Sequence, residues 1–211
     1  SNPDLTFKAS QDLFNNHNLR IIIGPVFKEN NLYLNKLPDV TFLTLSNKIT
    51  NNYSNVISAG INAISQINAI KKFQDIKQLE RTIFLVPNSD YKNEIEEAIK
   101  LTKIKLKDKY NYDTDPTLLT SQIEKITRYT QRKQNLIDEI ERIENSNDLN
   151  KEKKVENLKK LDTLGGINFD SVIIGDFDEN LKSVTTSLLY TDVSSNRVDY
   201  ISLNQWFDES L

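Results

Sequence analysis

The sequence contains no cysteine, one histidine and only 5 glycines among its 211 residues. Without cysteine there can be no disulfide bond and no thiolate chemistry, although this absence leaves the redox compartment open. The lone His17 excludes a histidine-based catalytic triad and a multi-histidine metal site, and we expect it on the surface. No Gly-x-Gly-x-x-Gly or Walker phosphate loop occurs, so the familiar kinds of nucleotide binding are not expected.

Charge and hydropathy argue against two further classes, nucleic-acid-binding proteins and membrane-spanning proteins. The 27 basic and 30 acidic residues give a formal net charge of -3. The Lys-rich stretch 151–160 interleaves its lysines with glutamates, which is typical of a solvated helix face, so a nucleic-acid partner is not expected. No apolar run reaches the roughly 20 residues that span a bilayer, and no signal-peptide pattern opens the chain.

Short apolar runs alternate with helical patterns along most of the chain. Runs rich in β-branched or aromatic residues predict strands at 19–23, 40–45, 82–86, 104–110, 171–174 and 198–203. Apolar residues at helical spacing predict helices at 60–79 and from about 88 to 102. This alternation predicts an α/β fold with doubly wound, mostly parallel sheets, whose ligand crevices lie beyond the carboxyl ends of the strands.

The segment 116–164 interrupts this alternation because it is about twice as long as a crossover helix requires. Apolar residues at heptad-like spacing lie on both sides of the turn Asn145-Ser146-Asn147-Asp148, which predicts an inserted antiparallel helical hairpin. Its arms are mostly charged outside one apolar seam. A stabilising protrusion and a partner-docking arm explain this pattern equally well.

Polar and aromatic residues follow several of the predicted strands and form the candidate ligand site. The candidates are Ser46, Asn47, Tyr91, Asp176 and Trp206, with Ser89, Phe177 and Phe207 beside them. At the carboxyl edge of the sheets these side chains could line a site for a small polar ligand. Core or packing roles account for the same residues equally well.

Three acidic pairs could in principle hold a cation or act as acid and base: Asp113/Asp115, Asp176/Asp178 and Asp208/Glu209. Each pair lies at a turn or helix start, where capping explains it without a function. An EF-hand calcium pattern is absent. We therefore predict no catalytic residue, no metal ligand and no cofactor.

Two early segments resemble those of type 1 periplasmic binding proteins. LRIIIGPVF at 19–27 is similar to their first apolar strand and Gly-Pro loop, and VTFLTLSN at 40–47 to the next strand and its serine-bearing cleft loop. The resemblance implies a two-lobed fold, with a partial first lobe at 1–59 and a second lobe at 60–211 that carries the hairpin at 116–164. The first lobe is expected to be incomplete, because the chain begins one strand-helix-strand unit late and stops at Leu211.

The second half resembles the penicillin-binding protein activator (LppC/LpoA lipoprotein) family. The likeness rests on RYTQRK at 128–133, LDTLG at 161–165 and FDSVII at 169–174. LLY at 188–190 and LNQW at 203–206 are similar to a later Leu-rich helix and Trp turn, although Ser202-Leu203 stands where the family has Gly-Thr. The resemblance implies a non-enzymatic periplasmic protein, anchored to the outer membrane by a lipid, that contacts a penicillin-binding protein or another envelope protein. The cysteine that would carry the lipid is absent from this chain.

Two other functions stay open beside this regulator of peptidoglycan synthesis. A periplasmic substrate-binding protein of the ABC-transporter type would bind an amino acid or a similar small polar solute in an open cleft around Ser46, Tyr91 and Asp176. The regulator would instead have a narrow or filled cleft. A hydrolase or transferase with an unusual site is disfavoured by the single histidine and the scarcity of glycine. Fold by itself does not separate the first two functions.

Overall fold

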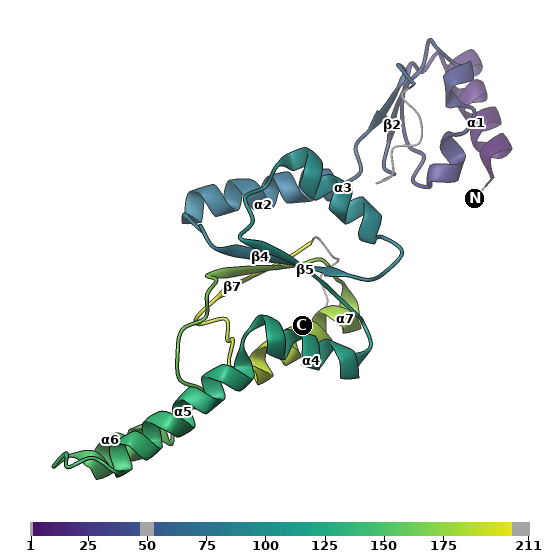
Figure 1. Ribbon diagram of the computed structural model, residues 1–211. Coiled ribbons are helices and arrows are strands. Elements are labelled where there is room, and N and C mark those ends of the chain that lie inside the picture. Colours follow the sequence, from purple (N-terminus) through teal and green to yellow (C-terminus); the bar gives the residue numbers. More distant parts are fainter. Residues whose placement is uncertain (1, 47–52, 204–211) are drawn as a thin grey trace. The chain divides into compact units, whose positions relative to one another are not determined.

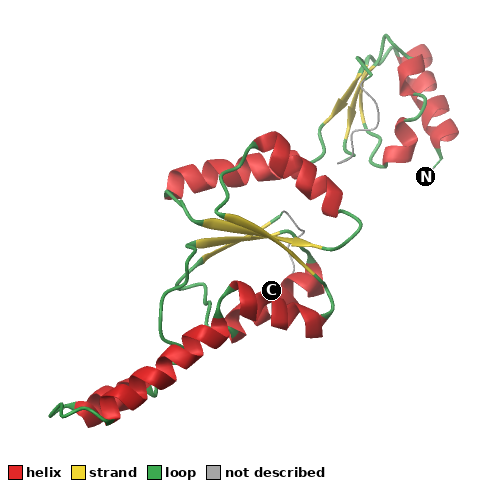
Figure 2. Ribbon diagram, in the orientation of Figure 1, coloured by secondary structure: helices red, strands yellow, loops and turns green. Residues whose placement is uncertain are grey.

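The computed structural model describes residues 2–46 and 53–203 (Figure 1). The chain divides into two compact units, Ser1–Ser65 and Gln66–Leu211. Each unit is built on one sheet of parallel strands (Figure 2). This confirms the predicted fold class, an α/β protein with parallel sheets.

The first unit contains a helix and a three-stranded sheet in the order β1-β2-β3. Its elements are α1 (Pro3–His17), β1 (Ile21–Ile23), the 3-10 turns η1 (Lys28–Asn31) and η2 (Leu34–Lys36), β2 (Thr41–Thr44) and β3 (Val56–Ser58). Asn2 caps α1 by accepting a hydrogen bond from the Leu5 amide, and Asn18 ends the helix in the left-handed conformation. His17 is exposed at the end of α1, as predicted.

One face of this first sheet is packed. Its core consists of Leu34, Leu37, Val40 and Phe42, which are all buried. Phe7 and Phe14 from α1 pack against this core, and so do Ile22 and Val56 from the strands. The side chains that stabilise the unit therefore lie on the α1 side of the sheet.

The second unit contains a four-stranded parallel sheet in the order β5-β4-β6-β7. The strands are β4 (Thr82–Pro87), β5 (Asp108–Tyr112), β6 (Ser171–Ile174) and β7 (Asp199–Ser202). Helices α2 (Ala63–Lys77) and α3 (Lys92–Thr102) lie on one face, and α4 (Pro116–Ile126) and α7 (Asp178–Tyr190) lie on the other (Figure 1). All residues of β4 and β6 are buried, as is typical of central strands in a parallel sheet.

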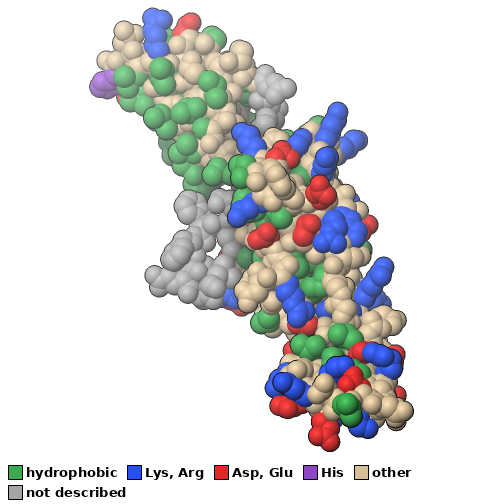
Figure 3. All heavy atoms as spheres, turned by 90° about the vertical axis from the view of Figure 1, so that its left-hand side faces the viewer, with side chains coloured by type: hydrophobic (Ala, Val, Ile, Leu, Met, Phe, Trp, Pro, Cys, Tyr) green, Lys and Arg blue, Asp and Glu red, His purple; other side chains and the backbone are tan. Residues whose placement is uncertain are grey.

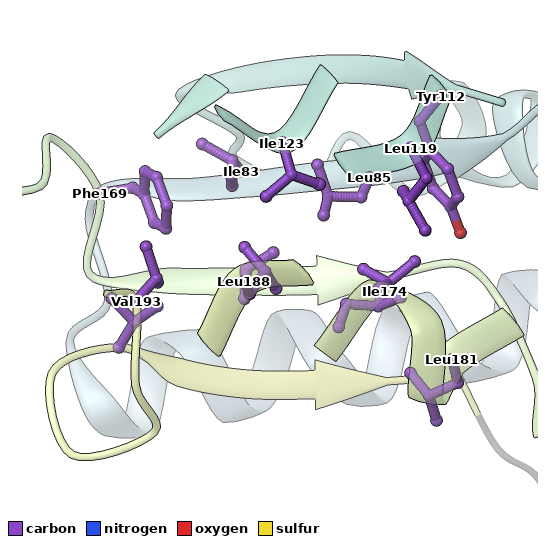
Figure 4. Close-up of a cluster of buried hydrophobic side chains, with 13 residues drawn as sticks. Ile83, Leu85, Tyr112, Leu119, Ile123, Phe169, Ile174, Leu181, Leu188 and Val193 are labelled. Atoms are coloured by element: carbon purple, nitrogen blue, oxygen red, sulfur yellow. The ribbon is translucent and has the colours of Figure 1, made fainter. Parts of the chain in front are cut away.

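The largest described core cluster of this unit lies between the sheet and helices α4 and α7 (Figure 4). Ile83 and Leu85 from β4 and Ile174 from β6 meet Leu119 and Leu188 from the two helices. The other face of the sheet packs against the layer of α2 and α3. Phe84 of β4 points to this side, because an added methyl group at Gly175 would meet both the Phe84 side chain and Ile95 of α3.

The predicted insertion at 116–164 is divided between two roles. Helix α4 belongs to the layer on the sheet, because its Leu119 and Ile123 are fully buried in the core cluster. The hairpin consists of α5 (Tyr129–Glu144) and α6 (Lys151–Leu158), which pack together and project from the sheet (Figure 1). We call α5 and α6 the arm.

Replacing Gly175 by alanine is expected to lower the free energy of unfolding by about 1–3 kcal/mol, the usual effect of overpacking a core. The new methyl carbon would lie 3.1 Å from Ile95 Cδ1 and 3.2 Å from the Leu85 carbonyl oxygen. Gly166 is the matched control, because a methyl group there meets no atom within 4 Å. Urea unfolding of the two variants provides the measurement. Equal stability of both variants would contradict the close packing described here.

Candidate functional site

The strand order places a switch point at the carboxyl edge of the second sheet. From β4 the chain crosses to β5 on one side, and from β6 it continues to β7 on the other. Ligand crevices of open parallel sheets lie at such a point, beyond the carboxyl ends of the strands. Tyr91 follows β4 and Asp176 follows β6, so two of the predicted site residues meet there.

Asp176 is fully buried, with 0% of its surface exposed. Its Oδ1 accepts hydrogen bonds from the Tyr91 hydroxyl at 2.5 Å, the Phe177 amide at 3.0 Å and Asn180 Nδ2 at 3.3 Å. Its Oδ2 accepts a hydrogen bond from the Tyr112 hydroxyl at 2.7 Å. Four donors match the roughly four acceptor positions of a carboxylate. The hydrogen-bonding capacity of Asp176 is thus used within the protein.

Tyr112 and Asn180 complete this cluster, and the sequence analysis did not select them. The predicted strand at 104–110 ends two residues before Tyr112, whereas β5 runs from Asp108 to Tyr112. The alternation Tyr110-Asn111-Tyr112 indicates that the strand continues to Tyr112 and that Tyr112 faces the core, because successive side chains of a strand point to opposite faces. Tyr112 is fully buried, and no sequence pattern pointed to Asn180.

Both tyrosine hydroxyls are held in the protonated state. Burial, followed by the hydrogen bond to Asp176, raises the pKa of Tyr91 and of Tyr112 well above the ordinary value of 10.0. The Tyr91 ring also packs against the Phe177 ring, with centroids 5.3 Å apart. The cluster therefore acts as a set of fixed donors around one carboxylate. It supplies neither a free base nor an ionised nucleophile.

Stability is expected to fall as the pH rises above 10. Burial also raises the pKa of Tyr200 to about 12. Because the folded-state pKa exceeds the unfolded-state value near 10, the unfolded chain loses these protons first and is favoured as the pH increases. The Tyr200 contribution is present below pH 10 and is lost by about pH 12. Urea unfolding between pH 8 and 12 should give a steeper fall for the natural chain than for the Tyr112→Phe variant, and identical slopes would count against the shift at Tyr112.

The other predicted site residues are not gathered into this cluster. Ser46 lies in the first unit, two residues after the end of β2. It is buried, and its carbonyl oxygen accepts a hydrogen bond from the Ser58 hydroxyl. Asn47 and Trp206 lie outside the described residues, as do Phe207 and the pair Asp208/Glu209. Of the five predicted site residues, the structure thus describes three: Ser46, Tyr91 and Asp176.

The acidic pair Asp113/Asp115 has a local structural role. Asp115 caps α4 by accepting hydrogen bonds from the amides of Thr117 and Leu118, which confirms the capping interpretation. Asp113 accepts a hydrogen bond from the Asp115 amide, and Asp178 lies in the first turn of α7. Within residues 2–46 and 53–203, no group of three or more acidic or histidine side chains is placed to hold a metal ion.

A second polar cluster fixes the base of the arm. Arg132 in α5 is only 3% exposed. Its Nε donates to the Thr127 carbonyl at 3.0 Å, its Nη1 donates to Thr163 Oγ1 at 2.8 Å, and its Nη2 donates to the Thr191 carbonyl. Asp192 Oδ2 lies 3.7 Å from Arg132 Nη1. One guanidinium thus joins three segments: the α4–α5 turn, the loop after α6 and the turn after α7.

Asp192 provides the opposite charge in this cluster. Its Oδ2 accepts hydrogen bonds from Thr163 Oγ1 at 2.5 Å and from Arg197 Nη1 at 2.9 Å. Beside it, the Leu164 amide donates to the Arg132 carbonyl at 3.0 Å. Burial lowers the pKa of Arg132, but a guanidinium keeps its proton in proteins. We call Arg132, Thr163 and Asp192 the arm anchor.

The two parallel sheets and their helices form a fold like that of the type 1 periplasmic binding proteins. Three solved structures share it. A branched-chain amino acid ABC transporter periplasmic ligand-binding protein from Burkholderia xenovorans matches with a TM-score of 0.51 at 8% identity. An ABC transporter substrate-binding protein from Desulfitobacterium hafniense matches with a TM-score of 0.53 at 12% identity. The C-domain of LpoA from Haemophilus influenzae, a regulator of PBP1A, matches with a TM-score of 0.51 at 12% identity.

These matches cover 97%, 98% and 95% of this chain, in the same order, and 48%, 53% and 51% of the other chains. The chain therefore spans about half the length of these structures. No protein-family model and no curated protein matches the sequence. Identities this low establish a shared fold, and function needs separate evidence. None of the described helices is long and apolar enough to cross a membrane.

Proposed function

We propose that this chain is a non-catalytic envelope protein that regulates or scaffolds peptidoglycan synthesis by contacting a penicillin-binding protein through its arm. The observation that carries the proposal is the arm anchor. A buried guanidinium is costly unless it is fully paired, and here its pairing fixes the direction of a projecting hairpin. A pre-oriented arm loses less conformational freedom when it binds a partner.

The arm also presents a surface suited to a protein partner. A groove of about 400 Å³ lies between the end of α5 and α6, lined by Glu144, Lys151, Glu152, Val155, Glu156 and Lys159. Val155 is buried, whereas the surrounding charged side chains are exposed. At the end of the hairpin Leu149 is 100% exposed. Apolar groups framed by charges of both signs are typical of specific protein interfaces.

The proposal extends to location and chemistry. The likeness to a periplasmic ligand-binding protein and to the LpoA C-domain supports a periplasmic location, and attachment to the outer membrane through a lipid is part of the proposal. The proposal includes a non-enzymatic role, and the enclosed Asp176 carboxylate, whose hydrogen bonds come from within the protein, is consistent with a structural role for this cluster. No cofactor is part of the proposal.

The alternative function is binding of an amino acid or a similar small polar solute. It is favoured by the position of Tyr91 and Phe177 at the switch point and by the two solute-binding structures of the same fold. Against it stands Asp176, which would be the acid available for a ligand ammonium group. Its four hydrogen-bond donors already come from the protein.

The deciding experiment compares the chain with an arm-trimmed variant in binding to purified penicillin-binding proteins. Residues 141–155 are replaced by a Gly-Asn-Gly turn, which retains the arm anchor. We expect measurable binding by the intact chain and at least tenfold weaker binding by the trimmed chain. Equal binding by both would refute the role of the arm, and binding by neither would refute the proposed partner.

A second measurement tests the alternative. Thermal unfolding of the intact chain is followed with each of a panel of amino acids and peptidoglycan fragments. A bound ligand at 100 times its dissociation constant adds about 2.7 kcal/mol to stability, so a reproducible rise in the melting temperature would favour the solute-binding function. We expect no rise with any amino acid.

A further inference from the structure

One ridge of helix α5 faces solvent along the arm. Residues four positions apart lie side by side on one face of a helix. From the start of α5 this row consists of Tyr129, Lys133, Ile137 and Glu141, and it ends at the C-cap residue Asn145. Lys133, Glu141 and Asn145 are exposed, and Ile137 is 43% exposed. We call these five residues the α5 ridge.

The α5 ridge is separate from the contact that holds the arm together. Helices α5 and α6 pack along each other, and their buried residues are Arg132 and Leu136 on α5 and Val155 on α6. Ile137 follows Leu136, and successive helical residues are about 100° apart around the axis, so Ile137 points away from this contact. Figure 3 views the molecule from the side toward which the arm projects, and hydrophobic side chains lie among basic and acidic ones at the bottom of the view.

Two opposite charges flank Ile137 at equal distances along the helix. Lys133 lies four residues before it, and Glu141 lies four residues after it. Among the residues that the structure describes, neither of these two side chains has an ion pair, whereas the neighbouring Glu139 pairs with Arg142 at 2.7 Å. The α5 ridge therefore carries an exposed aliphatic centre with one unpaired charge of each sign on either side.

The base of the α5 ridge is held in place. The ring of Tyr129 packs against the ring of Tyr190 on α7, with centroids 5.4 Å apart. Lys133 Nζ lies 5.8 Å from the centre of the Tyr129 ring. The arm anchor fixes Arg132 between these two residues. A ridge positioned in this way loses little conformational freedom when it binds.

We propose that the α5 ridge binds the α5 ridge of a second copy of this chain, antiparallel to it, about a twofold axis at Ile137. Ile137 then meets Ile137 of the second copy, and Lys133 meets Glu141 of the second copy. Each Lys133–Glu141 contact occurs twice, as does a contact between the Tyr129 hydroxyl and the Asn145 amide. A parallel arrangement would instead place like charges beside each other. The pattern of charges thus selects both the occupant and its direction.

Helix packing and symmetry support this arrangement. Ridges formed by every fourth residue interdigitate in the commonest class of helix packing, and twofold dimers are the commonest protein assemblies. The contact is small, so the association is expected to be weak and transient. The inference goes beyond the proposed function, because it concerns the α5 ridge rather than the groove beside α6 and requires no penicillin-binding protein.

Disulfide trapping tests the proposal, because a chain without cysteine forms a disulfide only at an introduced thiol. Ile137→Cys places the thiol at the twofold axis. Leu149→Cys is the control, because Leu149 is 100% exposed and collides freely, whereas antiparallel pairing keeps the two hairpin ends apart. In a glutathione redox buffer we expect at least about fivefold more disulfide-linked dimer from Ile137→Cys, measured by non-reducing electrophoresis.

Charge substitutions in the Ile137→Cys background separate specific pairing from random collision. Lys133→Glu and Glu141→Lys each replace attraction by repulsion, so each should lower the yield of linked dimer by at least about threefold. The combined Lys133→Glu/Glu141→Lys swap should restore the yield. The two single substitutions change the net charge in opposite directions, so collision of chains with a net charge of -3 would give a higher yield for Glu141→Lys. Circular dichroism verifies that these exposed substitutions leave the helices intact.

Equal yields from Ile137→Cys and Leu149→Cys would overturn the proposal. A higher yield for Glu141→Lys, or unchanged yields in both single-charge variants, would also overturn it, because the arms would then meet without the α5 ridge. A combined swap that fails to restore the yield would contradict the Lys133–Glu141 contact. None of these outcomes depends on the proposed function, since the chain is the only protein present.

Discussion

Replacing Asp176 by alanine is expected to lower the free energy of unfolding by about 3 kcal/mol, which corresponds to a fall in melting temperature of roughly 6–12 °C. The substitution removes the acceptor for the Tyr91 and Tyr112 hydroxyls at once. Tyr112 is fully buried, so water cannot replace the lost partner. A buried donor without an acceptor costs more than the hydrogen bond contributed.

The control for this prediction is Asp90→Ala, which removes an exposed carboxylate in the loop after β4 and should cost less than about 0.5 kcal/mol. A double-mutant cycle with Tyr112→Phe adds a second measurement. Asp176→Ala should cost less in the Tyr112→Phe background than in the natural chain, because the orphaned hydroxyl is gone. If Asp176→Ala leaves stability unchanged, the carboxylate is not a structural acceptor, and its use by a ligand would have to be considered again.

Replacing Arg132 by methionine is expected to lower the free energy of unfolding by about 2–4 kcal/mol and to loosen the arm. The carbonyl oxygens of Thr127 and Thr191 would lose their donor. Asp192 keeps Arg197 and Thr163 as partners, which limits the cost. Amide hydrogen exchange in α5 and α6 should be faster in the Arg132→Met variant than in the natural chain, whereas exchange in β4 should change less.

Arg142→Met provides the matched control, because Arg142 lies on the same helix. Its guanidinium is 70% exposed and pairs only with Glu139 among the described contacts. An exposed pair of this kind contributes at most about 1 kcal/mol. Similar stability and similar exchange rates in the Arg132→Met and Arg142→Met variants would contradict the arm anchor.

The arm anchor also separates two explanations of the hairpin that the sequence left equal. If the arm is only a stabilising protrusion, trimming residues 141–155 should lower stability without changing any binding. If it docks on a partner, trimming should weaken binding while the sheet and the arm anchor stay intact. The position of Arg132 at the base makes this separation possible, since the anchor remains when the outer part is removed.

The sequence predicts the central strands correctly, because strands that are buried on both faces consist of continuous apolar runs. Strands β4 and β6 were predicted at 82–86 and 171–174, and both are buried along their whole length. The range predicted for the edge strand β5, 104–110, begins too early, because it includes Ile104. This apolar residue is buried in the loop before the strand. Helix α1 and the three-residue strand β3 were not predicted, because a polar helix and so short a strand carry little periodic signal.

The sequence by itself determined the alternation of strands and helices and the hairpin, and it excluded a histidine-based triad, thiolate chemistry and the familiar phosphate-binding loops. Only the tertiary structure decided which polar side chains meet. Tyr112 and Asp176 are 64 residues apart, and they come together because β5, β4 and β6 pair in parallel and end at the same edge. Arg132 reads as one more solvated charge on a charged helix. It is buried because three separate segments converge on it, and convergence depends on packing between elements rather than on any local pattern.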